Sequence, residues 1–280
     1  IVGIVLARIL EPSHFGLLSI IMTLVAFGNI LRDSGISAGL IQKKEVDSND
    51  LSTFFYINIV LGFILTLTMF SSSGLLEKFY DFPDLGRVTR FVSLVFFIDS
   101  LGIIQLIILL RNVRLKTEAL IIITSSILSG GLAIFIALNG FGAWALAVNV
   151  VLGKVISLGF YWLIVDWKPQ LVFSIESIQD IKRFSLFLYA NRILNYILTY
   201  SDKLLIGKIL PLNKLGYYDR GKQYNELIKT TISRSLWKIA FPVFSRIQDE
   251  NDRLKSIYIK YFRIACFMFI PFFFLLSGIS

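Results

Sequence analysis

The sequence is poor in the side chains that build disulfide and metal sites. Its 280 residues include one cysteine and one histidine. Cys266 has no partner within the chain, which excludes an internal disulfide framework, and its apolar surroundings indicate a small buried side chain. His14 lies in a short polar stretch, and a single histidine without a cysteine partner makes no metal site. We therefore predict neither a disulfide framework nor a bound metal.

Charged residues are also scarce. They make up 17% of the sequence, apolar residues make up 55%, and the mean hydropathy is +0.72. A soluble domain has about a quarter of its residues charged, so this composition predicts a membrane protein. The net charge is nevertheless +9. This excess of bases either sets the topology through the loops or forms a cationic surface.

Both ends of the sequence lie within apolar runs. The first ten residues, IVGIVLARIL, are too few to cross a bilayer. They also lack the basic start and the small-residue cleavage site of a signal peptide. The last residues, FMFIPFFFLLSGIS, form a second interrupted run. We expect the sequence to be a fragment of a longer protein.

Long apolar runs predict membrane-spanning helices, because in lipid a helix satisfies its own backbone hydrogen bonds. The runs lie at 15–31, 51–70, 91–110, 119–138, 144–165, 184–207 and 257–279. Segment 217–243 carries seven charges, but we predict that it also crosses the membrane. If it does, most of the bases lie in loops on the inner side of the membrane, as is typical of membrane proteins. Arg32 belongs to one of these loops. The longest segments between spans have about twenty residues, as in 71–90.

An internal repeat relates two distant parts of the chain. The stretch LARILEPSHFG at 6–16 aligns without a gap with IGKILPLNKLG at 206–216, so that Gly16 matches Gly216 and Arg8 matches Lys208. On the predicted topology both copies cross the membrane in the same direction. A parallel repeat predicts two bundles with a site between them.

The repeat predicts an all-α, polytopic membrane protein with two parallel six-helix lobes. We expect about nine helices in this sequence. The N-terminal lobe covers 1–170, with a truncated first helix. Residues 171–280 supply the first three helices of a C-terminal lobe that is itself truncated.

Charged side chains within the spans mark a candidate site, because a charge at mid-membrane costs about 2.5–3.5 kcal/mol or more and normally faces a protein interior or a wet cavity. Lys222, Glu226 and Lys229 share one face of 217–243. A helix lying flat on the membrane would have a similar face. Asp99 and Lys154 are single charges in other spans, and either could pair within its own bundle.

Bases outnumber acids between residues 192 and 238. An excess of buried positive charge requires an anion, and phosphate accepts charge-assisted hydrogen bonds from arginine and lysine. The candidate binding residues in this cationic lumen are Arg192, Lys222, Lys229 and Arg234. Asp202 and Glu226 would hold these bases in place or carry a coupling proton or sodium ion.

Several stretches resemble the polysaccharide exporters of the multidrug/oligosaccharidyl-lipid/polysaccharide superfamily, in particular the Wzx-type lipopolysaccharide flippases. They are LARILEPSHFGLLSI, YSDKLLIGKIL, LGYYDRG and FPVFSRIQDENDRLK. The resemblance covers essentially the whole chain. It implies a multi-pass inner-membrane protein with a central cavity. Such a protein moves a polyprenyl-pyrophosphate-linked oligosaccharide to the outer leaflet by alternating access, coupled to an ion gradient.

Two other functions remain open from the sequence. A multidrug exporter of the same superfamily would favour an acidic lumen. A membrane polymerase or glycosyltransferase would need a sizeable catalytic loop, whereas Asp81 and Asp84 indicate a turn and no paired-carboxylate site or glycine-rich phosphate loop is found. We therefore predict a protein that is not an enzyme and uses no cofactor apart from the coupling ion. Its expected partners are a lipid-linked oligosaccharide, membrane lipids and other polysaccharide-assembly membrane proteins, without nucleic acid.

Overall fold

The structure is a computed structural model in two compact units, Ile1–Asp219 and Arg220–Ser280. It describes residues 2–33, 39–41, 43, 46–223, 225, 226, 255–263, 266, 267, 270, 271 and 274, with the backbone alone over 175–189. The second unit contains a helix over 255–263. The predicted boundary between lobes at residue 170 remains a prediction, because the first unit extends to Asp219 and includes part of the second repeat.

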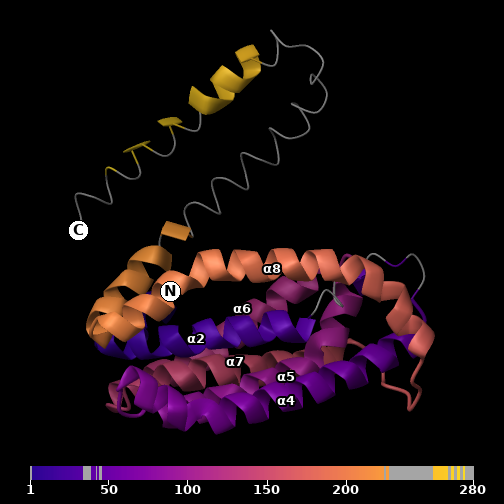
Figure 1. Cartoon of the computed structure of the whole chain (residues 1–280), viewed down its shortest axis with the longest axis horizontal. Coiled ribbons are helices and arrows are strands. Elements are labelled where there is room, and N and C mark those ends of the chain that lie inside the picture. The colour runs from indigo at the N-terminus through magenta and orange to yellow at the C-terminus, as the bar shows by residue number, and fades with distance from the viewer. Residues whose placement is uncertain are drawn as a thin grey trace. The chain divides into compact units, whose positions relative to one another are not determined.

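The first unit is built from helices (Figure 1). They are α1 (Val2–Ile9), α2 (Pro12–Asp33), α4 (Ser48–Tyr80), α5 (Leu85–Arg111), α6 (Leu115–Leu138), α7 (Ala143–Ile164) and α8 (Ile175–Ile209). Residues 212–223 are also helical, and no described residue lies in a strand. The prediction of an all-α fold is confirmed.

Five helices, α2 and α4 to α7, are long and apolar enough to cross a membrane. Several large apolar side chains on α4 and α6 are exposed, among them Phe63, Leu67, Ile127 and Phe135. Exposed apolar surface of this extent suits contact with lipid rather than with water. The chain is therefore a multi-pass membrane protein. The predicted run 184–207 lies within α8, which is not among the five.

The connection between α4 and α5 is much shorter than the sequence predicted. Within the segment 71–90, which was predicted to lie between spans, α4 continues to Tyr80 and α5 starts at Leu85. Asp81 and Asp84 both have left-handed backbone conformations, with φ of 57° and 68°, and the Asp81 N–H caps α4 by donating to the Glu77 carbonyl at 2.9 Å. The predicted turn at these aspartates is confirmed. The helix thus extends beyond the apolar run 51–70, because hydropathy falls before the helix itself ends.

The core of the first unit lies where α2, α4, α5 and α7 meet. α4 packs along α5, and α6 packs along α7. Fully buried side chains such as Ile20 and Ile21 from α2 and Val88 and Val92 from α5 fill the centre, with Leu215 from the second repeat added to them. The second repeat is thus already part of the core of this unit.

The two copies of the repeat fold into the same helix–bend–helix arrangement, which we call a corner. The first corner, residues 6–16, and the second corner, residues 206–216, each end a helix, bend and begin the next helix. The closing hydrogen bonds match position by position. Leu10 N–H donates to Leu6 O at 2.9 Å, as Leu210 N–H donates to Ile206 O at 2.8 Å. The repeat is therefore structural as well as sequential.

The two corners touch each other through their glycines. A Cβ atom on Gly16 would overlap the carbonyl oxygen of Leu212, and one on Gly216 would overlap the carbonyl oxygen of Pro12. Pro12 and Leu212 occupy equivalent positions in the repeat, so the contact is reciprocal, as between copies related by a two-fold axis. Glycine is needed at both positions because the backbones approach too closely for any side chain.

Candidate functional site between the repeats

The candidate site lies where α8, the first helix of the second repeat, packs against α2 of the first repeat (Figure 1). Tyr196 is buried there, and its hydroxyl donates a hydrogen bond to the Thr23 carbonyl at 3.2 Å. The Tyr196 ring packs against Phe27 with 5.1 Å between the ring centroids. At the other end of the contact, Gly207 leaves room for Ile20. The two helices therefore run antiparallel along most of α2.

Arg192 forms the ion pair that joins the two repeats at the end of α2. Its Nη1 atom bonds Oδ2 of Asp33, the last residue of α2. Both side chains are partly exposed. Asp33 is the one partner of Arg192 found among the described residues, and a guanidinium has five N–H donors, so donors remain for a further anion.

Asp202 lies in the same helix as Arg192 and bonds a side chain of the next helix. It lies ten positions beyond Arg192 on α8, about 15 Å along the helix axis, and accepts a hydrogen bond from the Tyr218 hydroxyl. Next to it, Lys203 forms a buried ion pair with Asp219. These two contacts join the first and second helices of the second repeat, and they lie far from Arg192 along α8.

The other predicted site residues belong to the second unit, Arg220–Ser280. Lys222 and Glu226 are half-buried in helical residues of the second unit. Lys229 and Arg234 lie outside the described residues. A single lumen formed by these six residues therefore stays a prediction.

The structure also reveals a group of three charges within the first repeat, of which Arg32 and Asp99 are largely buried and Lys154 is partly exposed. Asp99 of α5 bonds Nζ of Lys154 of α7 at 3.0 Å and lies 3.9 Å from Nη2 of Arg32. Sequence reasoning identified Asp99 and Lys154 as charges within spans, but it did not pair them. It placed Arg32 in a loop, which was wrong, because Arg32 lies buried in the last turn of α2.

The chemistry available at the candidate site is charge-assisted hydrogen bonding. Among the described residues no group of three or more histidine, cysteine or acidic side chains could hold a metal ion. The arginine and lysine side chains within the helices can bind carboxylate or phosphate oxygens, with the greater geometric specificity coming from arginine.

The chain is similar to several curated proteins of bacterial polysaccharide synthesis. It is 28% identical to the lipopolysaccharide biosynthesis protein WzxC of Escherichia coli strain K12, over 91% of this chain and 52% of the relative. It is 23% identical to the succinoglycan biosynthesis transport protein ExoT of Rhizobium meliloti strain 1021, over 89% and 50%. It is 25% identical to the teichuronic acid biosynthesis protein TuaB of Bacillus subtilis strain 168, over 94% and 57%.

The chain spans about half the length of the curated relatives that it matches. No solved structure shows a significant match to it. A family model described as "Polysaccharide biosynthesis protein" matches residues 5–280, which is nearly the whole chain. With its spanning helices and its repeated corner, the chain belongs to this family of membrane proteins of polysaccharide biosynthesis.

Proposed function

We propose that the protein containing this chain is a flippase for cell-surface polysaccharide export. It moves a polyprenyl-pyrophosphate-linked oligosaccharide from the inner to the outer leaflet of the cell inner membrane by alternating access. A proton or sodium gradient drives the movement. Family membership and the names of the relatives, one of which is a transport protein, support this proposal.

The reciprocal contact between Gly16 and Gly216 is the observation that carries the proposal. Two parallel repeats that meet at equivalent corners can tilt about that contact without unfolding either repeat. Parallel repeats with a substrate site between them are a common plan of secondary transporters. The contact thus supports a transporter more strongly than it supports an enzyme.

Arg192, Lys222, Lys229 and Arg234 would attract the pyrophosphate of the carrier lipid, since each offers charge-assisted donors to phosphate oxygens. Asp202 and Glu226 would hold these bases in place or carry the coupling ion. The saccharide would occupy the water-filled space between the repeats, and the prenyl chain would remain in lipid. A net basic lumen favours such an anionic substrate over the cationic drugs of a multidrug exporter.

Replacement of Arg192 in the full-length protein tests the assigned role. In a strain that lacks the native gene, the variant Arg192→Ala should reduce surface polysaccharide by about tenfold or more at equal protein level, because one charge-assisted contact is lost. Lys222→Ala should act in the same direction. The measurement is immunoblotting or staining of surface polysaccharide, with the protein quantified in membranes.

Two variants separate substrate binding from simple ion pairing. Asp33→Asn removes the carboxylate that pairs with Arg192 but leaves the positive charge of Arg192 in place. This variant should leave most export intact. Arg87→Ala removes an exposed arginine that pairs with Asp84 at 3.3 Å, and should leave export unchanged. Equal loss in Asp33→Asn and Arg192→Ala would contradict pyrophosphate binding, and normal export in Arg192→Ala would contradict any role for this arginine.

A further inference from the structure

The turn between α5 and α6 holds a valine in a backbone conformation that valine rarely adopts. Val113 has a φ of 53°, in the left-handed region, where a β-branched side chain crowds the backbone. The Val113 N–H donates to the Leu110 carbonyl at 3.1 Å, and the Arg114 N–H donates to the Leu109 carbonyl at 2.9 Å. Helices commonly end with this pair of hydrogen bonds and with glycine at the left-handed position. A valine in place of that glycine indicates a use for its side chain.

The Val113 side chain does not pack inside the protein. It is 74% exposed, and Leu115 is exposed as well. Arg114 and Lys116 alternate with these two apolar residues and are also exposed. Neither base has an ion pair or a side-chain hydrogen bond within the part of the chain that the structure describes. We call residues 113–116 the α5–α6 tip.

We propose that the α5–α6 tip binds acidic phospholipid at the membrane surface. Val113 and Leu115 enter the edge of the hydrocarbon layer, and Arg114 and Lys116 bind phosphate oxygens of the lipid headgroups. This binding requires neither transport nor the exported saccharide, so it does not depend on the proposed function.

The length of α6 places the tip at the required depth. α6 has 24 residues, which span about 36 Å at a rise of about 1.5 Å per residue. The hydrocarbon core of a bilayer is about 30 Å thick, so in an upright crossing each end of α6 lies about 3 Å beyond it. Leu115 is the first residue of α6, and Val113 comes two residues earlier. The tip therefore lies in the headgroup layer, next to the hydrocarbon.

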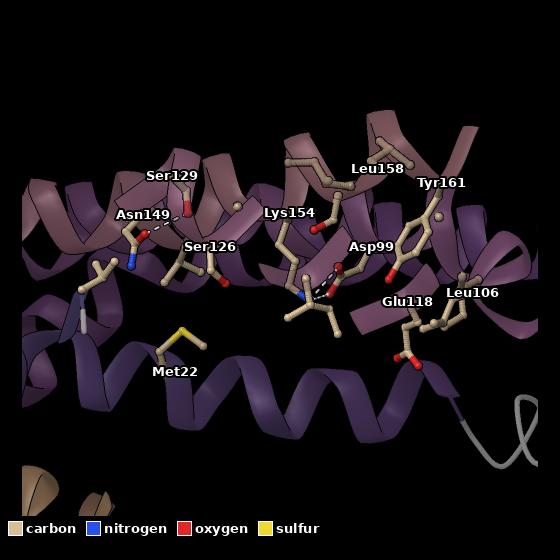
Figure 2. Close-up of a pocket in the computed structure, with 18 of the residues that line it drawn as sticks. Met22, Asp99, Leu106, Glu118, Ser126, Ser129, Asn149, Lys154, Leu158 and Tyr161 are labelled. Carbon is tan, nitrogen blue, oxygen red and sulfur yellow. Dashed lines mark hydrogen bonds and ion pairs between the residues drawn. The ribbon is translucent and has the colours of Figure 1, made fainter. Parts of the chain in front are cut away.

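The tip has positive charge without an acid of its own. No acidic residue lies between Asp99 and Glu118 in the sequence. Both of these acids line a cavity of about 680 Å³ whose walls come mainly from α2, α5, α6 and α7. Figure 2 shows Asp99 meeting Lys154 in this cavity, and Glu118 near Leu106. The bases of the tip are thus left to attract anions at the membrane surface.

Arg111 fixes the position of the tip. Its Nη1 atom donates to the carbonyl oxygens of Ile41 at 3.2 Å and Lys43 at 2.7 Å. These bonds hold the end of α5 against the segment that follows α2. A tip on a rigid support can bind a surface with little loss of conformational entropy.

The connection between α7 and α8 presents a similar surface at the same end of the bundle. The end of α7 lies beside the end of α5 and the start of α6, because Val165, Leu109 and Ile121 form one buried cluster. Beyond Val165, Leu171 is 94% exposed, and Phe173 is exposed too. Two exposed apolar segments at one end of a membrane bundle indicate contact with lipid rather than with water.

The exposed charges of these two segments are mostly basic. The connection has one exposed base, Lys168, and one exposed acid, Asp166. The tip adds Arg114 and Lys116. Bases beside exposed apolar side chains suit an acidic lipid surface, which offers phosphate to the bases and hydrocarbon to the apolar groups.

Thermal unfolding of the purified full-length protein in lipid nanodiscs tests the proposal. The nanodiscs contain phosphatidylcholine with a rising fraction of phosphatidylglycerol, and tryptophan fluorescence gives the Tm. Acidic lipid that binds the folded protein should raise the Tm until the site is saturated. Arg114→Gln and Lys116→Gln should each raise the phosphatidylglycerol fraction needed for half of this effect about fivefold, because each base contributes to binding at an acidic surface.

Arg87→Gln is the matched control for these charge variants. It removes an exposed arginine near the start of α5, at the opposite end of that helix from the tip, and should leave the response to phosphatidylglycerol unchanged. An equal loss in Arg87→Gln would indicate a general attraction between charges and would overturn the site. A Tm of the unaltered protein that does not rise with phosphatidylglycerol would also overturn it.

Val113→Gly separates lipid contact from a structural role of the valine. In phosphatidylcholine alone the Tm should stay the same or rise, because glycine adopts the left-handed turn without strain. The half-effect fraction of phosphatidylglycerol should nevertheless rise about twofold or more, because a tip without its apolar side chain enters the membrane less readily. A lower Tm in phosphatidylcholine would show that the valine stabilises the turn itself. An unchanged response to phosphatidylglycerol would point to another partner for Val113, such as a protein, and either result would overturn the proposal.

Discussion

The Lys203–Asp219 pair within the second repeat and the Arg192–Asp33 pair between the repeats differ in burial. Within the second repeat, Lys203 and Asp219 have side chains that are 13% and 6% exposed. Between the repeats, Arg192 and Asp33 are 37% and 23% exposed. Breaking a buried pair by removing one partner is strongly destabilising, whereas a solvated pair contributes little. Loss of the Lys203–Asp219 pair should therefore cost more stability than loss of the Arg192–Asp33 pair.

The end of α2 brings both kinds of pair together. Arg32 turns into the first repeat toward Asp99, and the next residue, Asp33, bonds Arg192 on α8. Successive residues of a helix point about 100° apart, so neighbours in sequence can serve different sides of it. A movement of α8 relative to α2 would change the Asp33 contact and leave the Arg32 contact in place.

Asp99→Asn should have the largest effect, because it leaves two bases without their shared acid. We expect a loss of about 3–5 kcal/mol in unfolding free energy, because Arg32 is buried and would keep its charge without an acid. Thermal unfolding of the purified protein, followed by tryptophan fluorescence, measures it. A stability equal to that of the unaltered protein would show that the Asp99 pairs are not needed within the repeat.

Gly216→Ala should have the next largest effect. We expect a loss of about 1–3 kcal/mol in unfolding free energy, because the new methyl group would overlap the backbone of the first corner. The matched control is Gly131→Ala in α6, where nothing lies within 4 Å of the added carbon. That change should be neutral or slightly stabilising, since alanine favours helix more than glycine does. The same loss in both variants would contradict a direct contact between the corners.

Asp33→Asn should have the smallest effect. It should lower the unfolding free energy by at most about 1 kcal/mol, because the pair that it breaks is partly exposed. Raising the salt concentration should further reduce the difference in unfolding free energy between Asp33→Asn and the unaltered protein, since solvated charges are screened. Arg87→Gln, which breaks the exposed pair with Asp84, provides the reference for a surface contact. If Asp33→Asn lowered the unfolding free energy as much as Asp99→Asn, the pair between the repeats would not differ from the pair within the first repeat.

Hydropathy predicted where the helices lie but not where each ends. The run 91–110 falls within α5, and 119–138 lies within α6. The end of α4 was missed because residues 71–80, although more polar, continue the helix up to the cap at Asp81. A local backbone conformation, rather than a change in hydropathy, ends that helix.

Charge reasoning identified which side chains are unusual, but it could not supply their partners. Asp99 and Lys154 are 55 positions apart, and Arg192 and Asp33 are 159 apart. Which acid meets which base depends on the rotation of each helix about its axis and on which helices are neighbours. Arg32 was assigned to a loop because it ends an apolar run, whereas packing against α5 buries it.

Composition and periodicity alone determined that this chain is an all-α membrane protein, because a long apolar run in lipid has few conformations that satisfy its backbone. The aligned glycines likewise indicated two equivalent corners. Only the tertiary structure decided that these corners touch, that Asp99 joins two bases beside a cavity, and that Arg192 bonds Asp33. Such contacts arise from the packing of distant helices, and no local pattern in the sequence encodes the distance between them.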